Sequence, residues 1–295
     1  MTRRASRESR TTRKPERPMR HPTCWGQRPA VMGVINLTPD SFSDGGQFNG
    51  EDQATREADR QIRDGADVLD LGAQSTRPGA DEVGAEEELR RLIPCLKAIR
   101  HAHPNAIISV DTFLAAVASA ALDAGADWIN DVSGGLHDSA MLPLIAEAGC
   151  PYVLMHSRGN SATMDSCTNY GTEGVVNAVR RELRDRTKQA LNEGVNQAQL
   201  IWDPGLGFAK DDEQNLELIR RLEDLKNDGI PLLLGPSRKR FIGAVLNQPQ
   251  PKARIWGTAA VCARAQSAGV HVLRIHDVGP IHQVVTMGAA IKRKP

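Results

Sequence analysis

The sequence is poor in the features that mark membrane proteins and disulfide-rich proteins. None of its apolar runs approaches the roughly 20 residues that a membrane-spanning helix needs. The charged N-terminus lacks the apolar stretch of a secretion signal, so we expect no signal peptide. The five cysteines are scattered and none forms a C-x-x-C pair. This argues against a zinc site or a disulfide framework and favours a reducing cytosol.

Common nucleotide-binding and hydrolase motifs are also missing. The sequence contains neither G-x-G-x-x-G nor G-x-x-x-x-G-K-[ST], the glycine-rich loops that bind dinucleotides and nucleoside triphosphates. It contains no G-x-S-x-G, the turn that carries the nucleophile of many hydrolases. What is present is the composition of an ordinary globular protein, with 40% hydrophobic and 25% charged residues.

The overall charge of +1 hides a basic N-terminus. Residues 1–20 hold eight basic and two acidic residues, a net charge of +6, so the rest of the chain carries −5. Because this segment has almost no apolar residues, we expect residues 1–22 to form a disordered tail before one domain, 23–295. A solvated tail is the simplest interpretation. A nucleic-acid-binding arm and an organellar transit segment stay open as alternatives.

From residue 28 onward, short apolar runs alternate with segments of helical periodicity. The predicted strands cover 31–36, 68–71, 107–110, 128–129, 152–155, 200–202, 232–234 and 272–275. The predicted helices cover 52–63, 86–101 with an interruption near Pro94, 114–124, 139–148, 175–192, 213–225, 253–268 and 280–291. Eight such units with short apolar strands predict an α/β fold, a (β/α)₈ or TIM barrel in a single domain. A doubly wound open sheet is the alternative.

Polar residues collect directly after these strands. Acceptors and amides follow four of them, at Asn36, Asp111, Asn130 and Asp203. A cationic set follows others, at Arg77, Lys239, Arg274 and His276. Because the carboxyl ends of parallel strands meet at one rim, where α/β proteins bind their ligands, we expect these side chains to converge.

This division of residue types has chemical meaning. Carboxylates and amides at the bottom of a cup suit a flat heterocycle with an amino-pyrimidinone edge, because they accept from and donate to adjacent ring groups. A cationic cluster suits phosphate or pyrophosphate. The Asn36 oxygen is a candidate ligand for Mg²⁺, which usually takes one or two protein oxygens besides phosphate and water.

Seven segments together resemble the signatures of the dihydropteroate synthase family. The two longest are residues 31–46, VMGVINLTPDSFSDGG, and residues 70–79, DLGAQSTRPG. Five shorter ones agree, at 109–112, 129–134, 203–208, 237–243 and 274–277. Any one segment is weak, but the whole set occurs in the family's order over about residues 28–288.

The resemblance implies an enzyme that joins p-aminobenzoate to 7,8-dihydropterin pyrophosphate, giving 7,8-dihydropteroate and pyrophosphate on the route to folate. By position, the pterin site is Asp111, Asn130, Asp203 and Lys239, and the pyrophosphate and Mg²⁺ site is Asn36, Arg274 and His276. The loops expected to close over the substrates carry Asp40, Ser41, Phe42, Thr76 and Arg77. The p-aminobenzoate pocket is bordered by Phe208, Lys239 and Arg240. The residues assigned to catalysis are Asp111, Lys239, Arg274 and His276.

The resemblance also implies partners and a location. We expect small-molecule substrates, Mg²⁺ as cofactor and a homodimer through the late helices, with neither nucleic acid nor a membrane as partner. The expected location is cytoplasmic, or organellar if the basic tail is a transit segment.

Two positions depart from the commoner family pattern. Gln74 stands where many members have Glu, and we expect it to have a structural role in its loop. Arg240 stands where many members have Ser, a residue usually linked to the carboxylate of p-aminobenzoate. Arg240 replaces that contact, or only the backbone N–H there matters.

Other residues are expected to be structural. Asp131 and Asp277 are predicted to act as caps or loop acceptors, and the four tryptophans are expected to serve packing. For His156 and Arg158, at the end of the fifth strand, both a functional and a packing role stay open. Two alternative functions remain: a pterin-dependent methyltransferase, and a degenerate pterin-binding paralogue without turnover.

Overall fold

The computed structural model describes residues 19–38, 50–74 and 83–292. Eight parallel strands form one sheet in the order β6-β5-β4-β3-β2-β1-β8-β7. They are β1 (Ala30–Asn36), β2 (Val68–Gly72), β3 (Ile108–Asp111), β4 (Trp128–Asp131), β5 (Tyr152–Met155), β6 (Leu200–Asp203), β7 (Leu233–Leu234) and β8 (Val272–Ile275). A parallel bridge between Trp202 and Leu232 joins the two outer strands and closes the sheet. The predicted (β/α)₈ barrel is therefore confirmed, and the open-sheet alternative is wrong.

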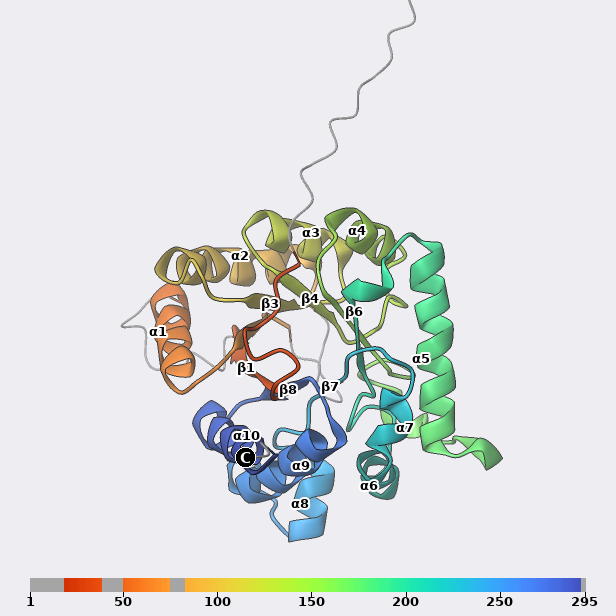
Figure 1. Cartoon of the computed structure of the whole chain (residues 1–295). Coiled ribbons are helices and arrows are strands. Elements are labelled where there is room, and N and C mark those ends of the chain that lie inside the picture. Colours follow the sequence, from red (N-terminus) through yellow and green to blue (C-terminus); the bar gives the residue numbers. More distant parts are fainter. Residues whose placement is uncertain (1–18, 39–49, 75–82, 293–295) are drawn as a thin grey trace, which may run out of the picture.

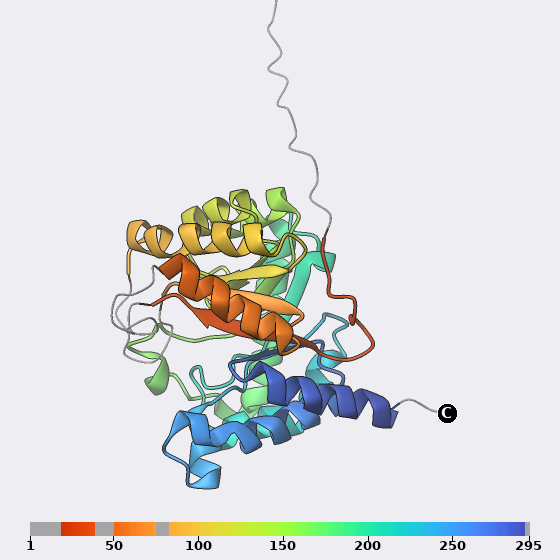
Figure 2. The same ribbon diagram turned by 90° about the vertical axis from the view of Figure 1, so that its left-hand side faces the viewer.

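Helices surround the barrel (Figure 1) and run beside the strands (Figure 2). They are α1 (Gly50–Arg63), α2 (Ala85–Ala102), α3 (Ala115–Asp123), α4 (Met141–Ala148), α5 (Val175–Asn192), α6 (Asp212–Arg220), α7 (Leu222–Lys226), α8 (Arg240–Leu246), α9 (Ile255–Ala268) and α10 (Val278–Lys292). Gly149 and Gly269 end α4 and α9 in the left-handed conformation, with φ of 67° and 81°, as their place after apolar helices predicts. Within the described residues, no helix is long and apolar enough to cross a bilayer.

Three helix predictions need correction. Helix α2 continues through Pro94, which is exposed, so the carbonyl that loses its helical partner can be hydrated. The predicted helix 213–225 is divided at Arg221, whose φ of −115° is not helical. Helix α8 was not expected because its seven residues are too few to show a helical period.

The core has two parts. A large cluster fills the space between the sheet and the helices, and a smaller one fills the barrel interior. The interior cluster contains Cys24, Ala30, Met32, Val68, Ile107, Trp128, Val153, Ile201, Leu233 and Val272. Because Cys24 precedes the first strand and Ala30, Val68, Trp128 and Val272 begin theirs, this cluster occupies the amino-terminal half of the barrel. The carboxyl half is left for a ligand.

The prediction that residues 1–22 form a disordered tail is wrong for Arg20 and His21. Arg20 donates from Nη1 to Asp127 Oδ1 at 2.9 Å and from Nη2 to the Asn105 carbonyl at 2.7 Å. The Trp128 Nε1–H donates to the Arg20 carbonyl at 2.7 Å, and the His21 ring lies 4.5 Å from that of Trp25. This segment therefore lies against the amino end of the barrel. Residues 1–18 of the predicted tail lie outside the described residues.

We expect Arg20→Ala to lower the free energy of unfolding by about 1 kcal/mol, because it removes a partly buried ion pair with Asp127. Urea unfolding measures this loss. Arg90→Ala is the control, since Arg90 forms a more exposed pair with Glu87 and its loss should change stability less than Arg20→Ala does. Equal effects of the two changes would contradict the assigned role of Arg20.

Candidate active site

The strand period places a polar layer directly above the apolar interior. Successive side chains of a strand point to opposite faces, so residues two apart share a face. The pairs that join an interior apolar residue to a polar one are Val68 and Asp70, Trp128 and Asn130, Ile201 and Asp203, and Val272 and Arg274. Four strands thus direct a charged or amide side chain into the carboxyl end of the barrel.

Arg274 lies between two of the carboxylates. Its Nε donates to Asp70 Oδ2 and its Nη2 to Asp111 Oδ2, each at 2.6 Å. Asn130 Nδ2 donates to the same Asp70 oxygen at 3.2 Å. Asp70 is fully buried and Asp111 is 6% exposed, so the guanidinium is the cation that makes two neighbouring carboxylates tolerable there.

The Asp111 carboxylate keeps unused hydrogen-bonding capacity. Its Oδ1 is buried and has no hydrogen-bond partner among the described residues, and the same is true of Asp70 Oδ1. Burial raises the pKa of Asp111 to about 7, although the Arg274 guanidinium opposes that rise. Buried oxygens without a donor are costly, so these two atoms are ready to accept N–H groups from a ligand.

A second acid–base pair lies across the barrel from this one. Asp203 accepts from the Gly205 N–H at 2.8 Å, and burial raises its pKa. Burial lowers the pKa of Lys239 to about 8, and the Asp203 carboxylate opposes that change. The Lys239 Nζ lies 4.2 Å from the centre of the Phe208 ring. The predicted pterin residue Lys239 and the predicted aryl-amine residue Phe208 are therefore adjacent.

His276 is oriented by the loop after β7. The Ser237 hydroxyl oxygen accepts from the His276 backbone N–H at 3.0 Å and lies 2.9 Å from its Nδ1. When the hydroxyl donates its hydrogen to Nδ1, the ring proton is left on Nε2. Arg238 holds this loop by donating to both carboxylate oxygens of Asp277, at 3.0 and 2.6 Å. Asp277 thus has the structural role that was predicted.

The other predicted residues do not all lie at the polar cluster. Asn36 ends β1 and pairs in register with Gly72, which pairs with Asp111, so it borders the cluster. Arg240 instead forms an exposed ion pair with Asp165, its Nη2 at 2.7 Å from Oδ1. Asp131 is a structural acceptor for the Ser133 and Gly135 N–H groups and the Tyr152 hydroxyl, as predicted. The loop residues Asp40, Ser41, Phe42, Thr76 and Arg77 lie outside the described residues.

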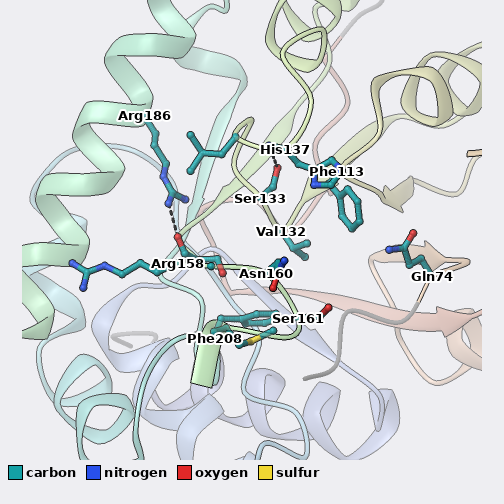
Figure 3. A pocket seen from close by; sticks show the side chains of 14 residues that line it. Gln74, Phe113, Val132, Ser133, His137, Arg158, Asn160, Ser161, Arg186 and Phe208 are labelled. Carbon is teal, nitrogen blue, oxygen red and sulfur yellow. Dashed lines mark hydrogen bonds between the residues drawn. The ribbon is translucent and has the colours of Figure 1, made fainter. Parts of the chain in front are cut away.

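A cavity of about 430 Å³ opens among the loops at the carboxyl ends of the strands (Figure 3). Its walls come from the loops after β3, β4 and β5, with Phe113 and His137 on one side and Phe208 on the other. Gln74 also lines it, and within the described part of the chain the Gln74 Oε1 has no hydrogen-bond partner. The cavity gives a ligand access to Phe208, the residue that lies against Lys239.

Asp70 is a site residue that the sequence analysis did not assign. It lies inside β2, where the other residues are Val, Leu and Gly. The available signal was an acidic residue within an otherwise apolar strand, since a buried carboxylate needs a partner.

Comparisons with known proteins agree on one family. The model of the pterin binding enzyme family matches residues 32–276. The dihydropteroate synthase of Synechocystis is 46% identical over 269 residues, which are 91% of this chain and 92% of that protein. The chain belongs to the dihydropteroate synthase family. The Bacillus subtilis dihydropteroate synthase is 41% identical over 268 residues, covering 91% of this chain and 90% of that protein.

Solved dihydropteroate synthases share the fold and have ligands bound. The Clostridium difficile enzyme, crystallised in the presence of pteroic acid, superposes with a TM-score of 0.85 at 40% identity, covering 92% of this chain and 99% of that one. The Xanthomonas albilineans dihydropteroate synthase in complex with 7,8-dihydropteroate gives a TM-score of 0.81 at 37% identity, covering 91% and 95%.

We expect Arg274→Met to destabilise the folded protein in a pH-dependent way. Removing one partner of a buried ion pair typically costs about 3–5 kcal/mol. Because the raised pKa of Asp111 lets the folded protein keep a proton that the unfolded chain releases, stability falls as pH rises from 3.8 towards 7. Without Arg274 that pKa rises further, so the loss should be larger at pH 8 than at pH 5.

Urea unfolding of both proteins at the two pH values measures the difference. Arg238→Met is the control, because Arg238 pairs with the more exposed Asp277 and its loss should change little with pH. A loss for Arg274→Met that is the same at both pH values would contradict the coupling to Asp111.

Proposed function

We propose that the chain condenses 7,8-dihydropterin pyrophosphate with p-aminobenzoate to give 7,8-dihydropteroate and pyrophosphate. The observation that carries this proposal is the buried set of Asp111, Asn130 and Asp203 beside the cations Lys239 and Arg274. An aminopyrimidinone edge offers N–H groups to the carboxylates and a carbonyl to the lysine. The related Xanthomonas albilineans dihydropteroate synthase was solved with 4-aminobenzoic acid and in complex with 7,8-dihydropteroate.

Binding of the pterin changes the partners of Arg274. In the free protein the guanidinium supplies the donors for Asp70 and Asp111. When pterin N–H groups take over at Asp111, Arg274 can turn towards the pyrophosphate of the same substrate. A guanidinium matches phosphate oxygens in geometry as well as in charge.

His276 and Mg²⁺ complete the proposed pyrophosphate site. The His276 Nε2–H, fixed by Ser237, is a second donor for the leaving group. Among the described residues, no three His, Cys, Asp or Glu side chains group as a metal site. Mg²⁺ with few protein ligands fits this arrangement, because it usually keeps water and substrate phosphates, and Asn36 would supply an oxygen. When bound, the ion would neutralise charge on the leaving pyrophosphate.

The proposed reaction exchanges one bond for another. The bond between the pterin methylene carbon and the pyrophosphate oxygen breaks, and the electron pair leaves with pyrophosphate. The resulting cation is delocalised into the pterin ring, where Asp111 favours it. The aryl amine nitrogen then bonds to the methylene carbon and releases a proton to solvent, so no strong base is needed. Phe208 and Lys239 border the side from which the amine arrives.

A direct assay tests the proposal. The wild-type protein is incubated with Mg²⁺, dihydropterin pyrophosphate and p-aminobenzoate, and both pyrophosphate and dihydropteroate are measured. Equal release of the two products supports the proposed function. Pterin binding without turnover would instead identify a degenerate paralogue, and methyl transfer from a reduced folate to a corrinoid would identify the methyltransferase alternative.

We expect Lys239→Arg to lower kcat/KM by at least about tenfold, a loss of roughly 1.4 kcal/mol in transition-state binding. The wider guanidinium does not fit between the Phe208 ring and the Asp203 carboxylate as a compact ammonium does. Arg240→Ser is the matched control, because Arg240 pairs with Asp165 at the surface and its loss should keep most activity. Steady-state kinetics measure kcat/KM for both variants, and circular dichroism checks that they fold. An unchanged kcat/KM for Lys239→Arg would contradict the role given to this lysine.

We also propose that the protein forms a homodimer through α9 and α10. The prediction that all tryptophans are packing residues fails for Trp256, which is 79% exposed at the start of α9. Met287 and Ile291 of α10 are 62% and 74% exposed. The only Lys or Arg residues in the two helices are Arg264 and Lys292, and neither helix has an Asp or Glu. An apolar outer face of this kind favours association with a second copy.

We expect Trp256→Glu to shift the protein from dimer to monomer in sedimentation velocity, because a buried unpaired carboxylate opposes association. Leu191→Glu, at an exposed position of α5, is the control and should leave the sedimentation coefficient unchanged. A wild-type protein that sediments as a monomer would contradict the proposed dimer.

A cytoplasmic location is proposed on the chemistry of the cysteines. All five are free, and four are buried, which suits a reducing compartment. An organellar location remains the alternative, since one relative, a pea folate synthesis bifunctional protein, is named as mitochondrial. That relative is 41% identical over 265 residues, covering 86% of this chain and 52% of that protein.

A further inference from the structure

Lys210 is a buried lysine that the reaction outlined above does not use. It lies in the loop between β6 and α6 and is 8% exposed. Its Nζ is within hydrogen-bonding distance of three acceptors: the Gly205 carbonyl at 3.1 Å, the Phe208 carbonyl at 2.9 Å and His156 Nδ1 at 3.1 Å. An ammonium has three N–H groups, so each one has a partner.

The neighbouring His156 is fixed as an acceptor for this lysine. Its ring is fully buried, and burial lowers its pKa to about 3, so the imidazole is neutral. Its Nε2 lies 3.0 Å from Glu182 Oε2, a carboxylate that Arg158 also binds. The carboxylate needs a donor, so Nε2 carries the ring proton and Nδ1 is left to accept from Lys210. His156 and Arg158, whose roles were left open, thus belong to one supporting network.

The hydrogen bonds of Lys210 fix the outer part of the loop after β6 more than its base. Asp203, at the base, is held by strand pairing with Met155 and by the His156 N–H, which donates to its carbonyl at 2.8 Å. Phe208 lies five residues further on, where its backbone N–H donates to Gly205 at 3.1 Å. Lys210 binds the carbonyls of both Gly205 and Phe208, so it joins the two ends of this turn.

We propose that Lys210 is a positioning residue for the aryl-amine substrate, acting by fixing the backbone turn that presents the Phe208 ring to Lys239. This inference rests on the proposed function, because it takes the Phe208 side of the site as the place of the aryl amine. Asp203 is held by strand pairing and by the His156 N–H. Loss of Lys210 should therefore disturb the pterin-binding Asp203 less than it disturbs Phe208.

The test compares the KM values of the two substrates. Lys210→Met removes all three donors at similar length, and Lys210→Gln keeps an amide that can bind two carbonyls. Lys188→Met is the control, since Lys188 is 74% exposed on α5. Kinetics are measured below pH 7, because burial lowers the pKa of Lys210 to about 7 and the ammonium must be present in the wild type. Thermal unfolding of each variant is recorded alongside.

We expect Lys210→Met to raise the KM for p-aminobenzoate at least about tenfold while the KM for dihydropterin pyrophosphate changes less than about threefold. Lys210→Gln should recover part of this loss, and Lys188→Met should behave as wild type. Equal increases in both KM values, or an unchanged KM for p-aminobenzoate, would overturn the inference. If Lys210→Met does not fold, Lys210→Gln decides; failure of both to fold would show a purely structural lysine. Absence of turnover in the wild type would instead overturn the proposed function, and the inference with it.

Discussion

The site depends on one buried arginine between two carboxylates. Asp70 and Asp111 lie in the polar layer above an apolar barrel interior, where water cannot screen two negative charges. Arg274 lies on β8, which is separated from β2 by β1, and it supplies the compensating cation in the free protein. Under the proposed function, a ligand that donates N–H groups to Asp111 takes over part of this role and releases the guanidinium.

The loops above this floor are held by buried cations that bind backbone carbonyls. Arg186 donates to the carbonyls of Met155 and Ser157 after β5, and Lys210 to those of Gly205 and Phe208 after β6. Arg254 donates to the Arg238 carbonyl after β7 at 2.9 Å. Loop carbonyls lack the regular backbone hydrogen bonds of helices and sheets. A buried cation with several N–H groups can donate to more than one of them. Buried cations therefore brace the loops after β5, β6 and β7.

Much of this could be predicted from the sequence, and the exceptions have physical reasons. Apolar runs marked all eight strands because parallel strands are buried on both faces, and the polar residues after them marked Asp111 and Asn130. Asp70 was not predicted because Arg274, the partner that gives it a role in the site, lies 204 residues away in the chain. The Arg240 ion pair with Asp165 was not predictable either, since its partners lie 75 residues apart in the chain. Arg20 was assigned to the tail because local composition cannot show that Asp127 lies near it.

The central claim is that the buried carboxylate and amide edge binds the pterin ring, and equilibrium binding tests it without turnover. Pterin-6-carboxylic acid, which lacks pyrophosphate, is titrated into the wild-type protein and into Asp203→Asn by calorimetry. The substitution keeps the shape of the side chain but removes its charge, and loss of a charge-assisted hydrogen bond typically costs about 1.5–3 kcal/mol. The account predicts at least about tenfold weaker binding with an unchanged circular dichroism spectrum. Equal affinity of a folded Asp203→Asn would contradict it.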